Sequence, residues 1–131
     1  AAFAVAQVAV LSPVEPEAFG RASIEAQAMG CPVIVSDGGA LPETLLPGGR
    51  SGWVVPAGNI PVLAQALETA LQLPAEAQAA MAAAARRHAL GFSKTTLQKK
   101  TLEVYDSLLA SSMANAFTEG LASAEYAHHT A

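Results

Sequence analysis

The chain has 131 residues, of which 52% are hydrophobic and 14% charged, and its formal net charge is −4 at pH 7. This balance excludes an intrinsically disordered protein, which combines few apolar residues with many charges, and the length fits one small domain. Lysine and arginine form no stripe along the sequence, so nucleic acid is not expected as a partner. A single cysteine, Cys31, and the lack of any apolar run of about 18 residues predict a cytoplasmic protein without a membrane span.

The first third of the chain predicts a strand, a helix and a second strand. Residues 8–12 (VAVLS) form a β-branched apolar run that Pro13 stops. A helix is predicted from about residue 20 to 29, because Gly30 suits the left-handed conformation that follows many helices. Residues 32–36 (PVIVS) predict the second strand. Both strands are apolar on both faces, which is typical of a parallel sheet covered by helices.

The central third predicts a turn, a third strand and a capped helix. In residues 37–43 (DGGALPE), Gly38 and Gly39 are free to adopt positive φ, and residues 42–46 are expected to add one helical turn. Residues 52–56 (GWVVP) predict a short strand, and Asn59 is a good N-cap for a helix over residues 60–73. The helix face that we expect to be buried comprises Val62, Leu63, Ala66, Leu67, Ala70 and Leu71.

The last third is predicted to be helical. Pro74 precedes an alanine-rich helix that ends near Leu90, and Ser93 is predicted to cap a further helix over residues 94–109. Residues 112–131 carry a weaker signal and are expected to form a helical or frayed extension. The buried side of the 94–109 helix is expected to comprise Leu97, Leu102, Tyr105, Leu108 and Leu109.

This order of elements predicts an α/β fold: a Rossmann-like half-domain of about three parallel strands with flanking helices and a helical C-terminal part. A mean sheet has about five or six strands, so the pattern resembles the second half of a doubly wound domain. The 8–12 strand would then have a free edge, which we expect to pair with another chain or to be covered by the C-terminal extension.

Two glutamates, Glu17 and Glu25, bracket the start of the first predicted helix. The free backbone N–H groups of a helix start suit an anion, and the eight residues from one glutamate to the other span at most about 12 Å along a helix. The pair could therefore hold the two ends of a phosphate-linked ligand, since carboxylates accept strong hydrogen bonds from hydroxyl groups. On the spacing alone, a solvated helix face is the simpler interpretation and the one that we favour.

The residues around this pair resemble a known family. The stretch EAFGRASIE, residues 17–25, matches the motif of two glutamates separated by seven residues in the retaining GT-B glycosyltransferases called glycosyl transferases group 1, or family 4. The similarity continues through EAQAMGCPVIVSDGGALPETLLPGGRSGWVVPAGN, LAQALETAL and VYDSLL. Residues 1–111 are therefore identified as the second half of the C-terminal, nucleotide-sugar-binding domain of such an enzyme.

The resemblance implies a role for each motif residue. Glu17 would be catalytic and lie at the donor sugar. The backbone amides of Phe19, Gly20 and Arg21 would contact the sugar hydroxyls and the diphosphate, and Glu25 would accept hydrogen bonds from the nucleotide ribose. The donor would be a UDP- or GDP-hexose, with no cofactor and no metal.

Two departures from the core motif need interpretation. Family members usually have an aliphatic residue where Arg21 stands, so this cation could meet a phosphate or an acidic sugar, or point to solvent, which we favour. Gly38, Gly39 and Glu43 form a Gly-Gly-x-x-x-Glu stretch, one residue longer than the family's Gly-Gly-x-x-Glu pattern, that we interpret as structural, with Glu43 tying down a neighbouring loop.

The family's acceptor-binding N-terminal domain, its glycine-rich loop and its Arg/Lys pair have no counterpart in these residues. Such cations stabilise the leaving diphosphate, so we expect the isolated chain to be inactive and to need that domain or a second chain.

The complete enzyme would be cytoplasmic, with a peripheral association with the inner membrane among the options. A truncated non-catalytic nucleotide-binding or interaction module is the alternative. A dehydrogenase-type binder is disfavoured, because no G-x-G-x-x-G follows a strand.

Six further positions have mainly structural interpretations. Cys31 is expected to be a buried, unreactive residue, and Trp53 to be part of the core or a cleft wall. His88 is expected to favour a helix C-terminus, whereas for Asp37 a cleft position and a turn-forming role are both open. His128 and His129 lack partners at metal-ligand spacing.

Overall fold

We analysed a computed structural model, which describes residues 2–109, 117, 119 and 120. The chain divides into two compact units, Ala1–Gly91 and Phe92–Ala131, and each is described here by itself. The first unit contains the sheet and every residue of the predicted site. The predicted boundary near residue 111 stays a prediction.

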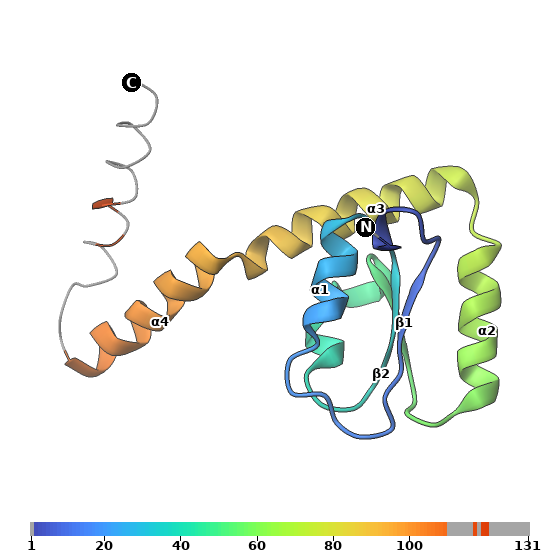
Figure 1. Cartoon of the computed structure of the whole chain (residues 1–131), viewed down its shortest axis with the longest axis horizontal. Helices are drawn as coiled ribbons and strands as arrows, with labels where there is room; N and C mark the ends of the chain where they lie inside the picture. The colour runs from blue at the N-terminus through green and yellow to red at the C-terminus, as the bar shows by residue number, and fades with distance from the viewer. Residues whose placement is uncertain (1, 110–116, 118, 121–131) are drawn as a thin grey trace. The chain divides into compact units, whose positions relative to one another are not determined.

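The sheet of the first unit consists of three parallel strands in the order β1-β2-β3 (Figure 1). These are β1 (Ala9–Leu11), β2 (Val33–Ser36) and β3 (Gly52–Val55). In register, Ala9 lies opposite Val33, and Val33 opposite Gly52. The predicted α/β class with three parallel strands is confirmed. Because parallel strands need long crossover connections, the helices between them cover the faces of the sheet.

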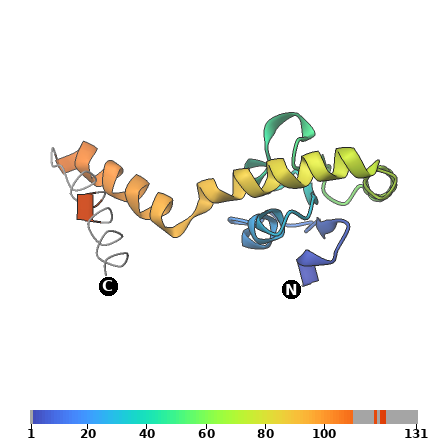
Figure 2. The same cartoon turned by 90° about the horizontal axis from the view of Figure 1, so that it is seen from above.

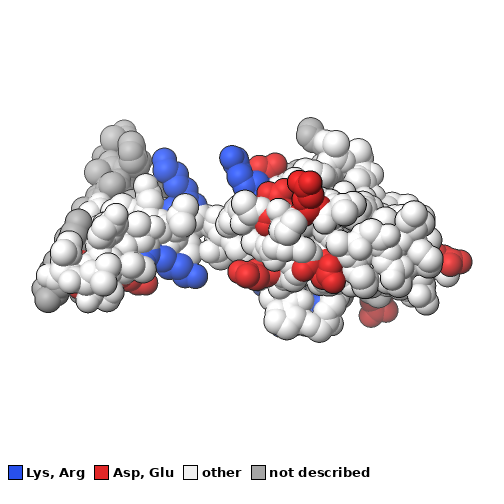
Figure 3. All heavy atoms as spheres, turned by 90° about the horizontal axis from the view of Figure 1, so that it is seen from below, with Lys and Arg blue, Asp and Glu red and all other residues white. Residues whose placement is uncertain are grey.

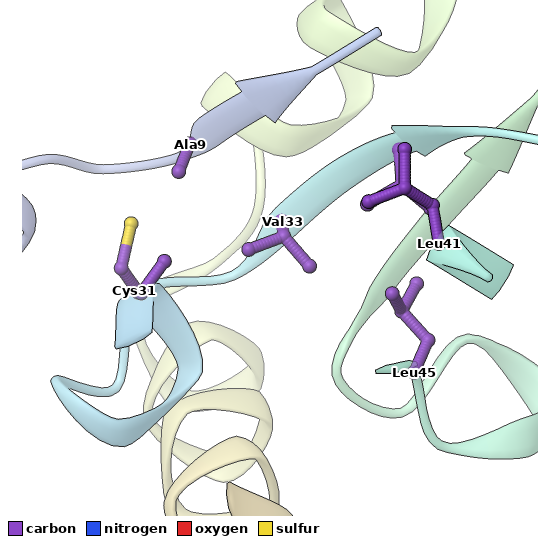
Figure 4. Packing of buried hydrophobic residues seen from close by; sticks show 7 residues of the cluster. Ala9, Cys31, Val33, Leu41 and Leu45 are labelled. Carbon is purple, nitrogen blue, oxygen red and sulfur yellow. The ribbon is translucent and has the colours of Figure 1, made fainter. Parts of the chain in front are cut away.

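Helices α1 (Arg21–Ala28) and α2 (Ile60–Leu71) cover opposite faces of the sheet, and α3 (Ala75–Ala89) packs along α1 (Figures 1 and 2). The central strand β2 is buried on both faces. Its Val33 and Val35 join the cluster on the α1 side, and its Ile34 joins the cluster on the α2 side. The α1-side core comprises Ala9, Ala26, Cys31, Val33, Val35, Leu41 and Leu45, five of which are labelled in Figure 4.

Local signals in the sequence predict most element boundaries. Asn59 caps α2 as expected, since its Oδ1 accepts from the Val62 amide at 3.2 Å. Gly30 adopts φ +76° directly after the α1 C-cap. Short 3₁₀ turns complete the unit: η1 (Ala2–Ala4), η2 (Leu41–Thr44), η3 (Pro47–Gly49) and, reaching the second unit, η4 (Leu90–Phe92).

Two burial predictions in the first unit are wrong. Val10 in β1 is 42% exposed, because β1 is an edge strand and no helix of the described residues covers its outer part. Leu71 is 55% exposed, because it is the last residue of α2 and lies beyond the part of the helix that packs on the sheet, where Ala66 and Ala70 are buried.

The second unit contains α4 (Lys94–Leu109), which begins where predicted: Ser93 Oγ accepts from the Thr96 amide at 3.1 Å. The prediction that its apolar side is buried is wrong, because Leu97, Tyr105, Leu108 and Leu109 are all exposed. Of the predicted 112–131 extension only 117, 119 and 120 are described, and they are helical. The remainder, including Leu121, lies outside the described residues.

Candidate functional site

Helix α1 begins at a glycine. Gly20 is the N-cap residue and adopts the left-handed conformation, with φ +79° and ψ +44°. A Cβ atom on it would lie 2.6 Å from Leu41 Cδ2 and would crowd η2. The Ser23 amide donates to the Gly20 carbonyl at 3.0 Å, which closes the first turn. Glycine is therefore required here both for its conformation and for the close approach of η2.

A second glycine brings Glu17 to the turn that follows β2. Gly39 has φ +65°, and its backbone forms an isolated parallel bridge with that of Glu17. The Ala40 amide donates to the Glu17 carbonyl at 2.9 Å, and a Cβ atom on Gly39 would overlap this same carbonyl. Of the two glycines predicted to adopt positive φ, only Gly39 does so. The two motif segments of the sequence, 17–25 and 38–43, thus meet at their backbones.

The side chains of the predicted site are exposed. Phe19 is 49% exposed, and both Glu17 and Glu25 face solvent. Arg21 Nη2 and Glu25 Oε1 form an ion pair at 3.6 Å, with 82% and 59% of their side chains exposed. An exposed pair of this kind contributes little to stability. The guanidinium points to solvent, as favoured from the sequence, but it does so beside the carboxylate of Glu25.

The site carries an excess of negative charge. In the described chain, the loops that follow the three strands and the first turn of α1 hold two cations, Arg21 and Arg50, and Arg50 lies at the far end of its loop, two residues before β3. Their carboxylates, all exposed, are those of Glu15, Glu17, Asp37 and Glu43. Acidic side chains gather on one face of the first unit in Figure 3. An anionic ligand bound here would depend on backbone N–H groups for most of its favourable electrostatic contacts with this chain.

Asp37 and Glu43 differ in what they do within the fold. Asp37 Oδ1 accepts from the Ala57 amide at 2.9 Å and ties the end of β2 to the loop before α2. This bond joins two loops and is not the local hydrogen bond of a turn-forming aspartate, so both interpretations of Asp37 stay open. The Glu43 side chain is exposed. The loop is held instead by Gly39, whose backbone pairs with that of Glu17, and by Thr44, which follows Glu43 and whose hydroxyl group contacts Ser23.

A buried polar network lies beneath the site and could not be predicted from the sequence. Ser23 Oγ and Thr44 Oγ1 lie 2.7 Å apart, and Gln27 Nε2 donates to the Thr44 carbonyl at 2.8 Å. His88 Nε2 of α3 lies 3.1 Å from the same carbonyl. The only local signal was the four-residue spacing of Ser23 and Gln27 on one face of α1, whereas their partners are distant in sequence. His88 thus makes a cross-element hydrogen bond in addition to lying near a helix end.

The remaining candidates are structural. Cys31 is 2% exposed, and burial raises the pKa of its thiol above the ordinary value of 9.0. Trp53 packs partly buried against the α2-side core. No described residues form a group of three metal-ligating side chains, and His128 and His129 lie outside the described residues. Within the part of the chain that the structure describes, no helix has the length and apolar character needed to cross a membrane.

Comparison with known proteins identifies the family. The family model described as "Glycosyl transferases group 1" matches residues 1–88, which include both glutamates of the motif and the Gly-Gly turn. The chain belongs to the glycosyl transferases group 1 family. A D-inositol 3-phosphate glycosyltransferase from Streptomyces scabiei is 38% identical over 103 residues, which are 79% of this chain and 22% of the relative. The chain therefore spans about a fifth of the length of this relative.

Solved structures share the fold. A glycosyltransferase from Rickettsia africae superposes with a TM-score of 0.76 at 31% identity, over 85% of this chain and 30% of the other. Anabaena Alr3699/HepE, solved in complex with UDP, superposes with a TM-score of 0.72 at 25% identity, over 81% of this chain and 29% of the other. The fold of this group 1 chain is the partial, Rossmann-like GT-B arrangement that the motif implied.

Proposed function

We propose that this chain is the donor-binding part of a retaining glycosyltransferase that transfers a hexosyl group from a UDP- or GDP-sugar. In this proposal the Glu17 carboxylate lies at the donor sugar and is the catalytic group. The backbone amides of Phe19, Gly20 and Arg21 contact the sugar and the diphosphate, and Glu25 accepts hydrogen bonds from the ribose. No cofactor or metal is required by this scheme.

The observation that carries the proposal is the family match over residues 1–88. It is supported by the geometry of α1, whose N-terminal amides lie beside an exposed Glu17 and a glycine N-cap. It is further supported by the Anabaena neighbour, whose structures contain UDP or UDP-glucose. Amides at a helix start and a carboxylate one turn into the helix are suited to a diphosphate and a diol.

The first experiment is a titration of the chain with UDP, followed by amide NMR. We expect shifts concentrated in residues 17–25, and a loss of affinity of about tenfold in Glu25→Gln, because a charge-assisted hydrogen bond is replaced by a neutral one. Glu68→Gln, on the exposed part of α2, is the matched control. An absence of shifts in residues 17–25 at millimolar UDP would contradict donor binding by this chain.

The isolated chain is proposed to be inactive. Two cations, Arg21 and Arg50, accompany four carboxylates in the first turn of α1 and the loops that follow the strands, so little net positive charge is available to a leaving diphosphate. The cations and the acceptor site are proposed to come from an N-terminal domain or a second chain, with the complete enzyme in the cytoplasm or peripheral to the inner membrane. Saturable transfer from a nucleotide sugar by the purified chain would overturn the proposal of inactivity.

The alternative is a non-catalytic module that binds a nucleotide or a protein partner. It is favoured by one observation, the excess of carboxylates over cations around the start of α1, which gives a leaving diphosphate little stabilisation. Joining the chain to an acceptor-binding domain of a group 1 enzyme distinguishes the two proposals. Transfer activity that is lost in Glu17→Gln supports the enzyme, whereas nucleotide binding without transfer supports the module.

A further inference from the structure

The buried polar network beneath the start of α1 has a single centre, Thr44. This residue is 2% exposed, and its two α1 partners, Ser23 and Gln27, are fully buried. Its hydroxyl group contacts Ser23 and donates to the Leu41 carbonyl at 2.6 Å. Its own carbonyl lies within hydrogen-bond distance of Gln27 and of His88. The three partners beyond η2 come from α1 and α3.

The direction of each hydrogen bond follows from counting protons. The single hydroxyl proton of Thr44 is used on the Leu41 carbonyl, so Ser23 must donate to Thr44 Oγ1. Ser23 Oγ in turn accepts from Gln27 Nε2 at 3.2 Å. The Gln27 amide cannot be flipped, because its oxygen would then face the Thr44 carbonyl oxygen. The bonds therefore run in one direction, from Gln27 through Ser23 and Thr44 to Leu41.

Thr44 also contacts the N-cap of α1 through its methyl group. A Cβ atom built on Gly20 would lie 3.5 Å from Thr44 Cγ2, so this methyl group closes the space directly behind the helix start. The preceding residue, Glu43, belongs to the Gly-Gly-x-x-x-Glu stretch whose Gly39 pairs with the Glu17 backbone. One buried residue thus joins the two segments that the family motif brings to the site.

We infer that Thr44 is a positioning residue for the donor site: its hydroxyl group fixes the first turn of α1, and through it the amides of residues 19–21, against the Gly39 turn. This inference rests on the proposed function for its effect on the nucleotide. It predicts that the hydroxyl group of Thr44, and not only its volume, controls nucleotide affinity, although Thr44 itself lies below the surface.

The variants separate the hydroxyl group from the methyl group. Thr44→Val keeps the shape but leaves the buried Ser23 hydroxyl without its acceptor. Thr44→Ser keeps the hydroxyl group and removes only the methyl group. Thr69→Val is the matched control, because Thr69 Oγ1 makes one exposed hydrogen bond, to the Gln65 carbonyl within α2. Urea denaturation of all three variants identifies any that fail to fold.

Two measurements on the full chain test the inference: titration with UDP, and amide hydrogen exchange without ligand. In Thr44→Val we expect about tenfold weaker UDP binding and about tenfold faster exchange of the Ser23 amide. Thr44→Ser is expected to restore both, and Thr69→Val to leave both unchanged. If the wild-type chain binds UDP and Thr44→Val binds it equally well, the inference is overturned.

The two proposals can fail separately. If the wild-type chain does not bind UDP, donor binding by this chain is contradicted. Amide hydrogen exchange is then the measurement that tests whether Thr44 positions the first turn of α1. Faster exchange confined to the first turn of α1, reversed in Thr44→Ser, supports that role. Unchanged exchange in Thr44→Val, or equal acceleration throughout α1, α2 and the sheet, overturns it.

Discussion

Gly39 combines a left-handed backbone, φ +65°, with direct contact to the Glu17 backbone. We expect Gly39→Ala to lower the free energy of unfolding by more than the about 1–3 kcal/mol that a strained φ costs on its own. Gly58→Ala separates the two effects, because Gly58 has φ +72° but no atom within 4 Å of an added Cβ. Urea denaturation measures both variants. Equal losses would contradict a special role for the contact between Gly39 and Glu17.

Cys31 is a buried thiol whose pKa is raised by desolvation, partly offset by a backbone hydrogen bond from Ala9. We expect its reaction with a thiol reagent at pH 8 to be at least about 100-fold slower in the folded chain than in urea, because the buried thiol is protonated and inaccessible. A comparable rate in both states would show that the α1-side core opens readily.

The same raised pKa gives stability a pH dependence. The folded state holds the Cys31 proton more tightly than the unfolded state, so this contribution is fully present below pH 9.0 and is lost as the pH rises through the folded pKa. Cys31→Ala should remove this part of the alkaline loss, and unfolding curves measured from pH 7 to pH 10.5 test it.

At the scale of elements, α3 completes the C-terminal end of α1. Arg86 Nη2 donates to the Met29 carbonyl at 3.2 Å, and its guanidinium lies directly over Gly30. We expect Arg86→Met to lower the free energy of unfolding by about 0.5–1.5 kcal/mol through the lost hydrogen bond. The neighbouring Arg87 is exposed, and Arg87→Met should change stability by less than about 0.5 kcal/mol. Equal effects of the two substitutions in thermal unfolding would exclude a specific role for Arg86.

Helix ends could be predicted from the sequence because their causes lie within a few residues. Asn59, Ser93 and Gly30 act on amides and carbonyls of their own helices, so the residue type was sufficient. The partners of Thr44 could not be predicted, since Ser23 and His88 are 21 and 44 residues away from it. Burial of α4 was wrongly predicted for a related reason: an apolar stripe indicates a preference for burial but not the surface that provides it.

In the candidate site, too, local features could be predicted from the sequence, whereas contacts between elements could not. The motif residues Glu17 and Glu25 were found by their spacing and surroundings, and the structure puts both at the exposed start of α1. Two contacts were not predicted: the pairing of the Gly39 and Glu17 backbones, and the ion pair of Arg21 with Glu25. Both depend on the three-dimensional arrangement, which no local pattern encodes.

At the scale of the whole molecule, β1 is an edge strand, and no other strand of the described residues pairs with its outer side. The Ala9 amide donates inward to the Pro32 carbonyl at 2.9 Å, so the amide of the next residue, Val10, faces away from β2. We expect the chain to self-associate through this edge. Val10→Pro removes the outward amide and should shift sedimentation toward the monomer, whereas Val10→Ala keeps the amide and the association. A wild-type chain that stays monomeric would contradict this expectation.

The order of the strands in the sheet has a consequence for how the first unit forms. Strand neighbours are also chain neighbours, and the paired residues Ala9 and Val33, then Val33 and Gly52, are separated by short stretches of sequence. Since the entropy of closing a loop grows only slowly with its length, each strand can be added as it leaves the ribosome, in the direction of synthesis. The bonds from Arg86 to Met29 and from His88 to Thr44 require α3, which is synthesised after all three strands, so we expect them to form last. Packing of α3 against α1 would therefore be the step that fixes the final position of α1.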